Sequence, residues 1–244
     1  LTTSKETYMS NPTRFPSGLS TSNQTEPLGN YPLPDPFHTG SQASMGVSTF
    51  QSDFNTLGTA DYTVTGTSST AALGNVVGGA LVITPGGTTT ATAVYKNANT
   101  TQFIAGQRLW YTTRFQASAV AGNVSFYAGL RAGSSANDGI WFSKAAASTS
   151  VNLVSVVGST STTLVTGVTT AAAATNLDLG LYFDGTDLLV YVGGVLTSRV
   201  SAPTIGSSAT TLTNALLTPV WQITPVATET LTVDFVLSAQ EIVR

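Results

Sequence analysis

The sequence contains no cysteine and a single histidine, His38. Without cysteine the chain has neither a disulfide framework nor a thiolate nucleophile, and a zinc site built from the usual cysteine and histidine ligands is not available. A general base needs a fixed position and usually an orienting partner. His38 lies in a proline-rich stretch, so we expect it to be a contact or solvent-exposed residue. The sequence predicts no cofactor and no metal.

Charged residues are also scarce, at 9% of the chain compared with about 25% in typical soluble domains. The net charge is -3 and the isoelectric point is near 4.9. Because the few Lys and Arg residues are scattered, neither a nucleic acid nor an anionic membrane is an expected partner. No run approaches the roughly 18–20 apolar residues that span a bilayer. Residues 1–6 lack the basic-then-apolar layout of a signal peptide, so the sequence gives no sign of export by that route.

The composition changes abruptly near Gly46. Six of the ten prolines lie before this point, without any hydrophobic period: Pro12, Pro16, Pro27, Pro32, Pro34 and Pro36. Proline removes a backbone donor and biases the preceding residue toward extended conformations. After Gly46 the chain consists of short alternating runs of Thr, Val, Ser, Ala and Gly. We therefore predict an extended N-terminal arm over residues 1–46 and a single β-module over residues 47–244.

The arm carries large apolar side chains at irregular spacing, whereas a solvated linker is usually rich in Gly and Ser or in charge. This pattern favours insertion of the side chains into pockets of a partner or of a neighbouring copy. The open alternative is that the arm folds back over its own module. The contact candidates are Tyr8, Phe15, Leu19, Tyr31, Leu33 and Phe37.

Apolar and polar residues alternate in four runs of the module, at 109–117, 124–130, 177–183 and 231–237. The predicted buried face of the last run is Leu231, Val233, Phe235 and Leu237. Such alternation is typical of antiparallel sheets that are packed on one side, and two facing sheets would bury these residues in one core. Residues 184–187 read as a tight hairpin turn. We predict an all-β sandwich of two antiparallel sheets, with roughly ten to thirteen strands and essentially no helix.

The module offers few groups for catalysis. Glycoside hydrolysis is the main enzymatic alternative because it needs only two carboxylates, but no strand carries a Glu-x-Asp-x-x-Glu pattern that would project acids into one cleft. Asp184 and Asp187 belong to a turn, where Asp is favoured for backbone reasons. The sequence therefore predicts that the protein is not an enzyme.

Two kinds of binding site stay open as alternatives. A calcium site would use Asn137 and Asp138 with Asp184 or Asp187, because oxygen ligands suit a hard cation, although the spacing matches no specific loop. A sugar site would use an exposed aromatic residue with neighbouring amides. The candidates for it are Trp110, Trp141 and Trp221. Each lies in a strand-like run, where packing in the core is the commoner role.

Six short runs of the module are distinctive in their order and spacing: 57–64, 108–115, 137–142, 182–185, 231–235 and 239–241. Together they resemble tailed-bacteriophage head structural proteins, and the resemblance covers most of residues 50–243. It implies a concanavalin-like jelly-roll sandwich that serves as a cement, or decoration, protein on the exterior of a bacteriophage capsid.

From this resemblance we expect the major capsid protein as a partner and the outer surface of the virion as the location. Self-association is expected to give a homodimer in preference to a homotrimer. The six contact candidates of the arm would then lie in grooves between capsid subunits. The alternative function is a carbohydrate-binding, lectin-like or adhesin module displayed on the virion, with a glycan as its partner.

Overall fold

The fold is described by a computed structural model that covers residues 45–58, 60–74 and 78–243. These residues form seventeen strands and no helix, so this part of the chain has no helix long and apolar enough to cross a membrane. The strands outnumber the ten to thirteen that the sequence predicts, because several are only two to four residues long.

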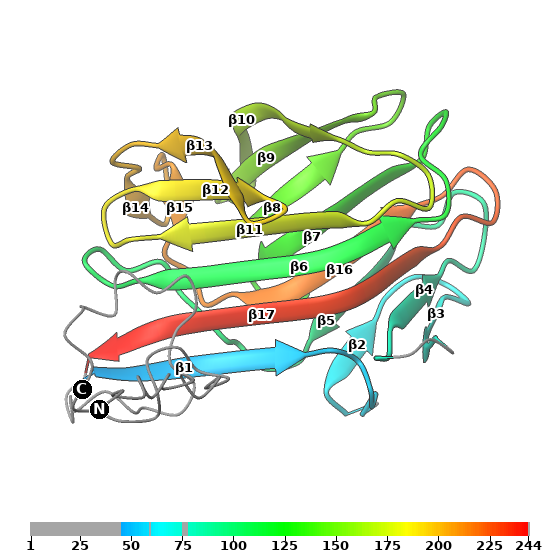
Figure 1. Ribbon diagram of the computed structural model, residues 1–244, viewed down its shortest axis with the longest axis horizontal. Helices are drawn as coiled ribbons and strands as arrows, with labels where there is room; N and C mark the ends of the chain where they lie inside the picture. The colour runs from blue at the N-terminus through cyan, green and yellow to red at the C-terminus, as the bar shows by residue number, and fades with distance from the viewer. Residues whose placement is uncertain (1–44, 59, 75–77, 244) are drawn as a thin grey trace, which may run out of the picture.

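One layer of the sandwich is an eight-stranded antiparallel sheet (Figure 1). Seven of its strands are, in spatial order, β13 (Val195–Val200), β12 (Leu188–Val192), β11 (Leu177–Phe183), β6 (Leu109–Ala117), β17 (Leu231–Val243), β4 (Leu81–Thr84) and β3 (Thr70–Leu73). The eighth, β1 (Met45–Ser52), pairs with the C-terminal half of β17. The strand β1 thus begins two residues before the predicted start of the module, and its first residue lies beside the C-terminal end of β17 (Figure 1).

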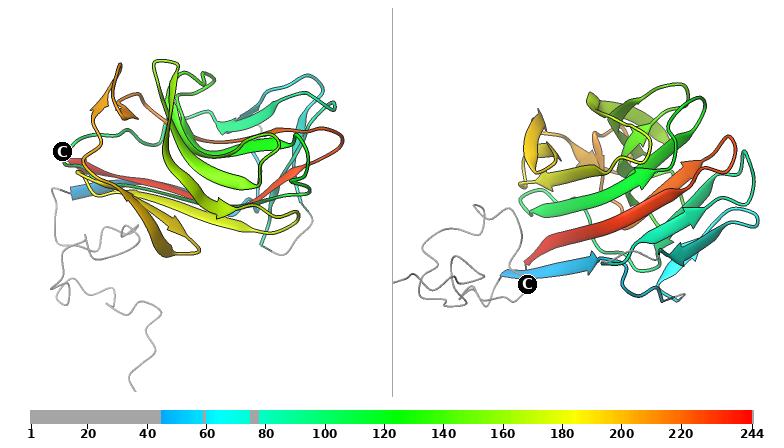
Figure 2. Two further views of the ribbon diagram at one scale, coloured as in Figure 1. Left: turned by 90° about the horizontal axis from the view of Figure 1, so that it is seen from above. Right: turned by 45° about the vertical axis from the view of Figure 1, so that its right-hand side comes forward.

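The second layer is a seven-stranded antiparallel sheet behind the first (Figures 1 and 2). Its strands are, in spatial order, β10 (Thr160–Thr170), β9 (Ser150–Val157), β8 (Gly139–Lys144), β7 (Ser125–Arg131), β16 (Thr218–Thr224), β5 (Thr92–Lys96) and β2 (Tyr62–Val64). Two very short strands, β14 (Ile205–Gly206) and β15 (Leu212–Thr213), pair in parallel outside both sheets. The predicted all-β sandwich of two antiparallel sheets is confirmed.

The hydrophobic core lies between the two sheets. Every second residue of β6, β7 and β11 is buried, as the alternation predicts. The rings of Phe115 from β6 and Phe126 from β7 meet edge to face, with centroids 5.6 Å apart, and so join the layers. Edge-to-face packing is a preferred arrangement of aromatic pairs.

The fourth predicted run, in β17, departs from simple alternation. Leu231 and Val233 are buried in the core, but the pairing with β6 shifts register between Val233 and Phe235. The extra residue of this β-bulge reverses the side-chain alternation. Val236 therefore takes the inward position, and Phe235 and Leu237 lie on the outer face of the sheet. The prediction that Phe235 and Leu237 share the buried face of Leu231 is wrong.

Candidate functional site

A row of residues crosses the outer face of the seven-stranded sheet. Trp141 in β8 is paired with Gly129 in β7, Gly129 is paired with Val220 in β16, and Val220 is paired with Tyr95 in β5. The neighbours of Trp141 in its own strand, Ile140 and Phe142, belong to the core. Successive side chains of a strand point to opposite faces, so the whole row points away from the core.

Gly129 allows β7 to lie close to the β8 backbone at Trp141. A Cβ atom on Gly129 would lie 2.3 Å from the carbonyl oxygen of Ile140 and 2.5 Å from the Cα of Trp141, which is closer than real contacts allow. With no side chain opposite it, Trp141 stacks on Tyr127, two residues along β7, with ring centroids 5.0 Å apart and an angle of 25° between the planes. The glycine thereby keeps the two strands that carry this aromatic pair close together.

The hydroxyl of Tyr127 joins this aromatic pair to two polar side chains. It accepts a hydrogen bond of 2.8 Å from Nη1 of Arg131 and donates one of 2.8 Å to Oε1 of Gln222. Burial raises the pKa of the Tyr127 hydroxyl above its ordinary value, while the charge and the hydrogen bond of Arg131 act in the opposite direction. The tyrosine is therefore a neutral donor near pH 7 and fixes the position of both partners.

Arg131 is held in place from two further sides. Its Nε donates a 3.0 Å hydrogen bond to the carbonyl of Gly133, and its Cζ lies 5.1 Å from the centroid of the Tyr95 ring, in a cation–π contact. We call Trp141, Tyr127, Arg131, Gln222 and Tyr95 the Trp141 cluster. Its members come from four strands of one sheet, β8, β7, β16 and β5, and present aromatic rings next to hydrogen-bonding groups.

The other two tryptophans occupy different surroundings. Trp221 is fully buried in the core, where its indole Nε1 donates a 3.1 Å hydrogen bond to Oγ1 of Thr113. Trp110 lies on the outer face of the eight-stranded sheet and stacks on Tyr182, with centroids 5.3 Å apart. Of the three tryptophans suggested by the sequence, Trp221 is therefore in the core, whereas Trp110 and Trp141 lie on outer faces, and the polar side chains beside Trp141 are joined by hydrogen bonds.

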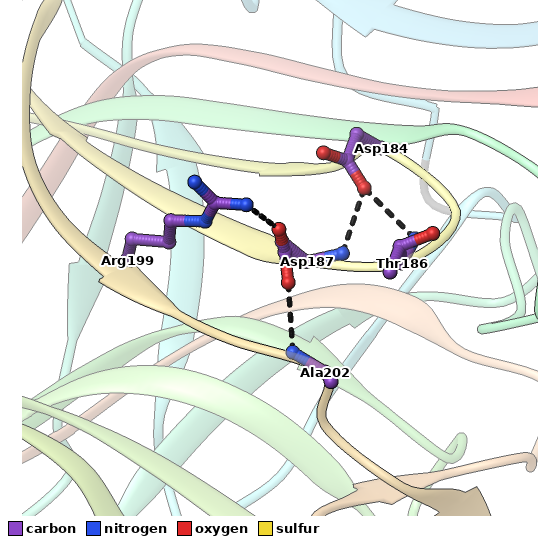
Figure 3. Close-up of polar contacts among 5 residues, drawn as sticks. All are labelled: Asp184, Thr186, Asp187, Arg199 and Ala202. Atoms are coloured by element: carbon purple, nitrogen blue, oxygen red, sulfur yellow. Dashed lines mark hydrogen bonds and ion pairs between the residues drawn. The ribbon is translucent and has the colours of Figure 1, made fainter.

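The carboxylates near the predicted hairpin serve the backbone, and the hairpin itself is confirmed (Figure 3). Oδ1 of Asp184 accepts hydrogen bonds from the backbone N–H groups of Thr186, at 2.8 Å, and Asp187, at 2.7 Å. Asp187 in turn accepts from the N–H of Ala202 at 2.7 Å and forms an ion pair with Arg199. Asp184 thus stabilises the turn, and Asp187 connects the start of β12 to β13 and the residues that follow it.

Asp138, the other proposed calcium ligand, is engaged in a similar way. Its Oδ1 accepts hydrogen bonds from the N–H of Gly158 at 3.1 Å and the hydroxyl of Thr213 at 2.9 Å. Among the residues that the structure describes, no group of three or more His, Asp or Glu side chains is placed to hold a metal ion. The arrangement therefore gives these acids a structural role.

Sequence reasoning missed Tyr127, Arg131, Gln222 and Tyr95. Part of the signal was present, because the inward alternation of 124–130 places Tyr127 and Arg131 together on the opposite face. The arm candidates Tyr8, Phe15, Leu19, Tyr31, Leu33 and Phe37, like His38, lie outside the described residues.

Comparisons with known proteins support the architecture. No protein-family model matches the chain, and no curated protein matches its sequence. Among solved structures, an endo-1,3-β-glucanase from Streptomyces sioyaensis is similar with a TM-score of 0.57 and 12% identity, over 87% of this chain and 100% of that one. A β-glucanase from Bacillus licheniformis has a TM-score of 0.55 and 11% identity, over 78% of this chain and 97% of that one. The fold is a concanavalin-like jelly roll.

A third similar structure is an endo-β-1,4-glucuronan lyase from the fungus Trichoderma reesei, with a TM-score of 0.50 and 13% identity, over 78% of this chain and 94% of that one. The two glucanases and this lyase contradict the prediction that the chain is not an enzyme, because its fold is one that glycan-active enzymes use. The prediction rested on the lack of a paired-carboxylate pattern, and that argument addresses hydrolysis alone. A lyase cleaves without adding water. At these identities the likeness shows the fold.

Proposed function

We propose that the protein binds a glycan on the outer face of the seven-stranded sheet, through the Trp141 cluster. The observation that carries this proposal is the stack of Trp141 on Tyr127 beside the fixed side chains of Arg131 and Gln222. Aromatic rings next to a few oriented polar groups are the usual composition of a small-ligand site. The fold, which glycan-active proteins share, supports the same class of ligand.

The cluster would bind a sugar through the part of its surface that remains open. Trp141 is 8% exposed, while Tyr127, Gln222 and Tyr95 are half-buried. A sugar ring would therefore lie along the edges of the aromatic rings and receive hydrogen bonds from the polar side chains. Because these side chains are already held by one another, binding would cost little side-chain entropy.

The test measures binding of the full chain to a panel of soluble polysaccharides by affinity electrophoresis and calorimetry. Trp141→Ala is expected to weaken binding about tenfold, because a lost aromatic contact of about 1.4 kcal/mol corresponds to that factor. Trp110→Ala is the matched control, since Trp110 also stacks on a tyrosine but lies on the other sheet. New reducing ends in the same mixtures would report cleavage of the bound glycan.

The proposal fails if the folded protein binds no member of the panel. It also fails if Trp110→Ala abolishes binding while Trp141→Ala leaves binding unchanged, because the glycan would then occupy the eight-stranded sheet.

A second candidate function is the decoration of a bacteriophage capsid, which the resemblance of the sequence implies. The observation that favours a protein partner is the apolar surface at the edge of the eight-stranded sheet, where Val195 is 66% and Leu196 50% exposed. With few charges in the chain, such a surface suits contact with the major capsid protein or with a second copy of this chain. The location would be the outer surface of the virion.

Cosedimentation of the full chain with phage capsids tests this second function. A variant with Phe15, Tyr31 and Phe37 replaced by Ala is expected to lose capsid binding, because buried aromatics tend to dominate protein interfaces. Leu196→Asp should weaken either capsid binding or dimer formation, as seen by analytical ultracentrifugation. Full occupancy by both variants would contradict a decorating role through these residues.

A further inference from the structure

The Trp141 cluster contains a buried cation without a carboxylate partner. Arg131 is only 3% exposed, and none of the ion pairs among the described residues includes it. A buried charge is costly unless it is paired. Its neighbours supply two hydrogen-bond acceptors, a carbonyl and a tyrosine hydroxyl, and the face of an aromatic ring, but none of them carries a negative charge.

The surrounding sheet does not supply the missing charge. None of the seven strands contains an Asp or Glu, while the same strands contain Lys96, Arg131 and Lys144. This is unexpected in a chain with a net charge of -3. The acids within strands instead lie in the eight-stranded sheet, at Asp178, Asp234 and Glu241.

The hydrogen bonds inside the cluster leave two donors unused. Arg131 uses Nη1 and Nε, so its Nη2 has no partner among the described residues. Gln222 directs Oε1 to the hydroxyl of Tyr127, so its Nε2 is left free in the same part of the structure. Both nitrogens retain solvent contact, because the fully buried unpartnered polar atoms in the described residues are those of Thr101 and Tyr111.

A buried cation without an ionic partner, next to a free amide donor, favours an anionic ligand. Arginine is a donor only, and Gln222 offers its Nε2 as a second donor while its Oε1 accepts from Tyr127. A carboxylate accepts only and is negatively charged, so it can pair with both donors and also compensate the charge of Arg131, whereas a sugar hydroxyl supplies no charge. The planar guanidinium also matches a carboxylate in geometry and charge.

We infer that the glycan bound at the Trp141 cluster is a polyuronate, whose carboxylate pairs with Nη2 of Arg131 and Nε2 of Gln222. This inference rests on the proposed glycan binding and names its ligand class. The sugar ring that carries the carboxylate lies against Trp141 and Tyr127, and Tyr127 sets the spacing between the two donors.

The experiment compares oligogalacturonates with their methyl esters, which have the same sugar rings without the charge, in calorimetric titrations of the full chain. The acid is expected to bind at least about tenfold more tightly than the ester, and its affinity is expected to fall as salt is added. Dextran sulfate is the third ligand and tests for attraction to any polyanion.

Two variants locate the carboxylate. Gln222→Glu keeps the size of the side chain and an acceptor for Tyr127, but replaces the free donor by a negative charge. It is expected to reduce binding of the acid at least about tenfold through repulsion and through pairing with Arg131. Gln116→Glu makes the same change on the eight-stranded sheet, in β6, and should leave the affinity within about twofold. Arg131→Lys keeps the charge without the planar fork and should also weaken binding of the acid.

Each outcome separates the inference from the function on which it rests. Equal, Trp141-dependent binding of acid and ester would overturn the polyuronate while leaving glycan binding intact. Equal binding of dextran sulfate, unaffected by Gln222→Glu, would also overturn it, because attraction would then be nonspecific. No binding of any glycan would overturn both. Binding of the acid that Gln222→Glu abolishes and Gln116→Glu preserves would support both.

Discussion

The indole of Trp141 stacks on the ring of Tyr127, 5.0 Å away, although the residue paired with Trp141 in the neighbouring strand is Gly129. A side chain at position 129 would collide with the β8 backbone that carries Trp141. The aromatic pair on the outer face therefore depends on a residue that has no side chain. Its geometry therefore links the packing of β7 on β8 to the surface where we propose that a glycan binds.

Gly129→Ala is expected to damage stability and binding together. The added Cβ would approach the Ile140 carbonyl to 2.3 Å and the Trp141 Cβ to 2.5 Å. Relief requires a shift of the β8 backbone, and overpacking of this kind costs about 1–3 kcal/mol. Urea unfolding should show this loss, and titration with the glycan should show weaker binding, as for Trp141→Ala.

Gly180→Ala is the matched control in the other sheet. A Cβ there would make ordinary contacts of 3.5 Å with the Tyr111 carbonyl and 3.6 Å with the Cβ of Tyr191. The free energy of unfolding should change by no more than about 0.5 kcal/mol. An equal loss of unfolding free energy in both variants would contradict the conclusion that β7 and β8 approach unusually closely at Gly129.

The sequence predicts the sandwich because inward and outward residues differ in polarity, and this pattern is local. It does not predict the Trp141 cluster, because that depends on which strands become neighbours. Gln222 reaches Tyr127 across a separation of 95 residues. Trp110, Trp141 and Trp221 all lie in apolar runs, so only the pairing of strands reveals which one is in the core.

The bulge in β17 is a second feature that polarity alone does not predict. Leu231 and Phe235 look equivalent in the sequence, but Leu231 lies in the core and Phe235 is half-buried on the outer face. We expect Leu231→Ala to cost about 2–5 kcal/mol through the cavity it creates. Phe235→Ala should cost clearly less, despite the larger deletion. Urea denaturation measures the free energy of unfolding of both variants. A greater loss of this free energy for Phe235→Ala than for Leu231→Ala would argue against the bulge.

Acid should weaken the contacts through which Asp187 connects the start of β12 to β13 and the residues after it. The N–H of Ala202 and the charge and hydrogen bond of Arg199 hold the pKa of Asp187 below its ordinary value of 3.8. A carboxyl whose pKa is lower in the folded state contributes stability above its unfolded pKa and loses this contribution as pH falls through the folded pKa. Asp187→Asn should therefore lower the urea midpoint near neutral pH, and the difference should shrink below about pH 4.

The control for this pH dependence is Asp53→Asn, which removes one negative charge from an exposed position. Its urea midpoint should follow that of the unmodified protein at both pH values. A constant difference between Asp187→Asn and the unmodified protein from neutral to acid pH would show that the side chain acts through packing and not through its charge.

Thr113 connects the two sheets through the core. Its Oγ1 accepts from the indole of Trp221 at 3.1 Å and donates to the carbonyl of Phe235 at 3.0 Å, and the residue is fully buried. Thr113→Val keeps the shape but leaves the indole N–H without this acceptor and removes one hydrogen bond to the Phe235 carbonyl. Each buried unpaired group costs roughly 1–3 kcal/mol, so we expect a large fall in the urea midpoint.

Thr112→Val is the matched control for Thr113→Val, since Thr112 is the preceding residue of β6 and points to the outer face. It should change the free energy of unfolding by no more than about 0.5 kcal/mol. A second variant, Thr113→Val with Trp221→Phe, removes the indole N–H as well, and it should lose less than the sum of the single losses. Strict additivity would mean that the hydrogen bond between the sheets contributes nothing to stability.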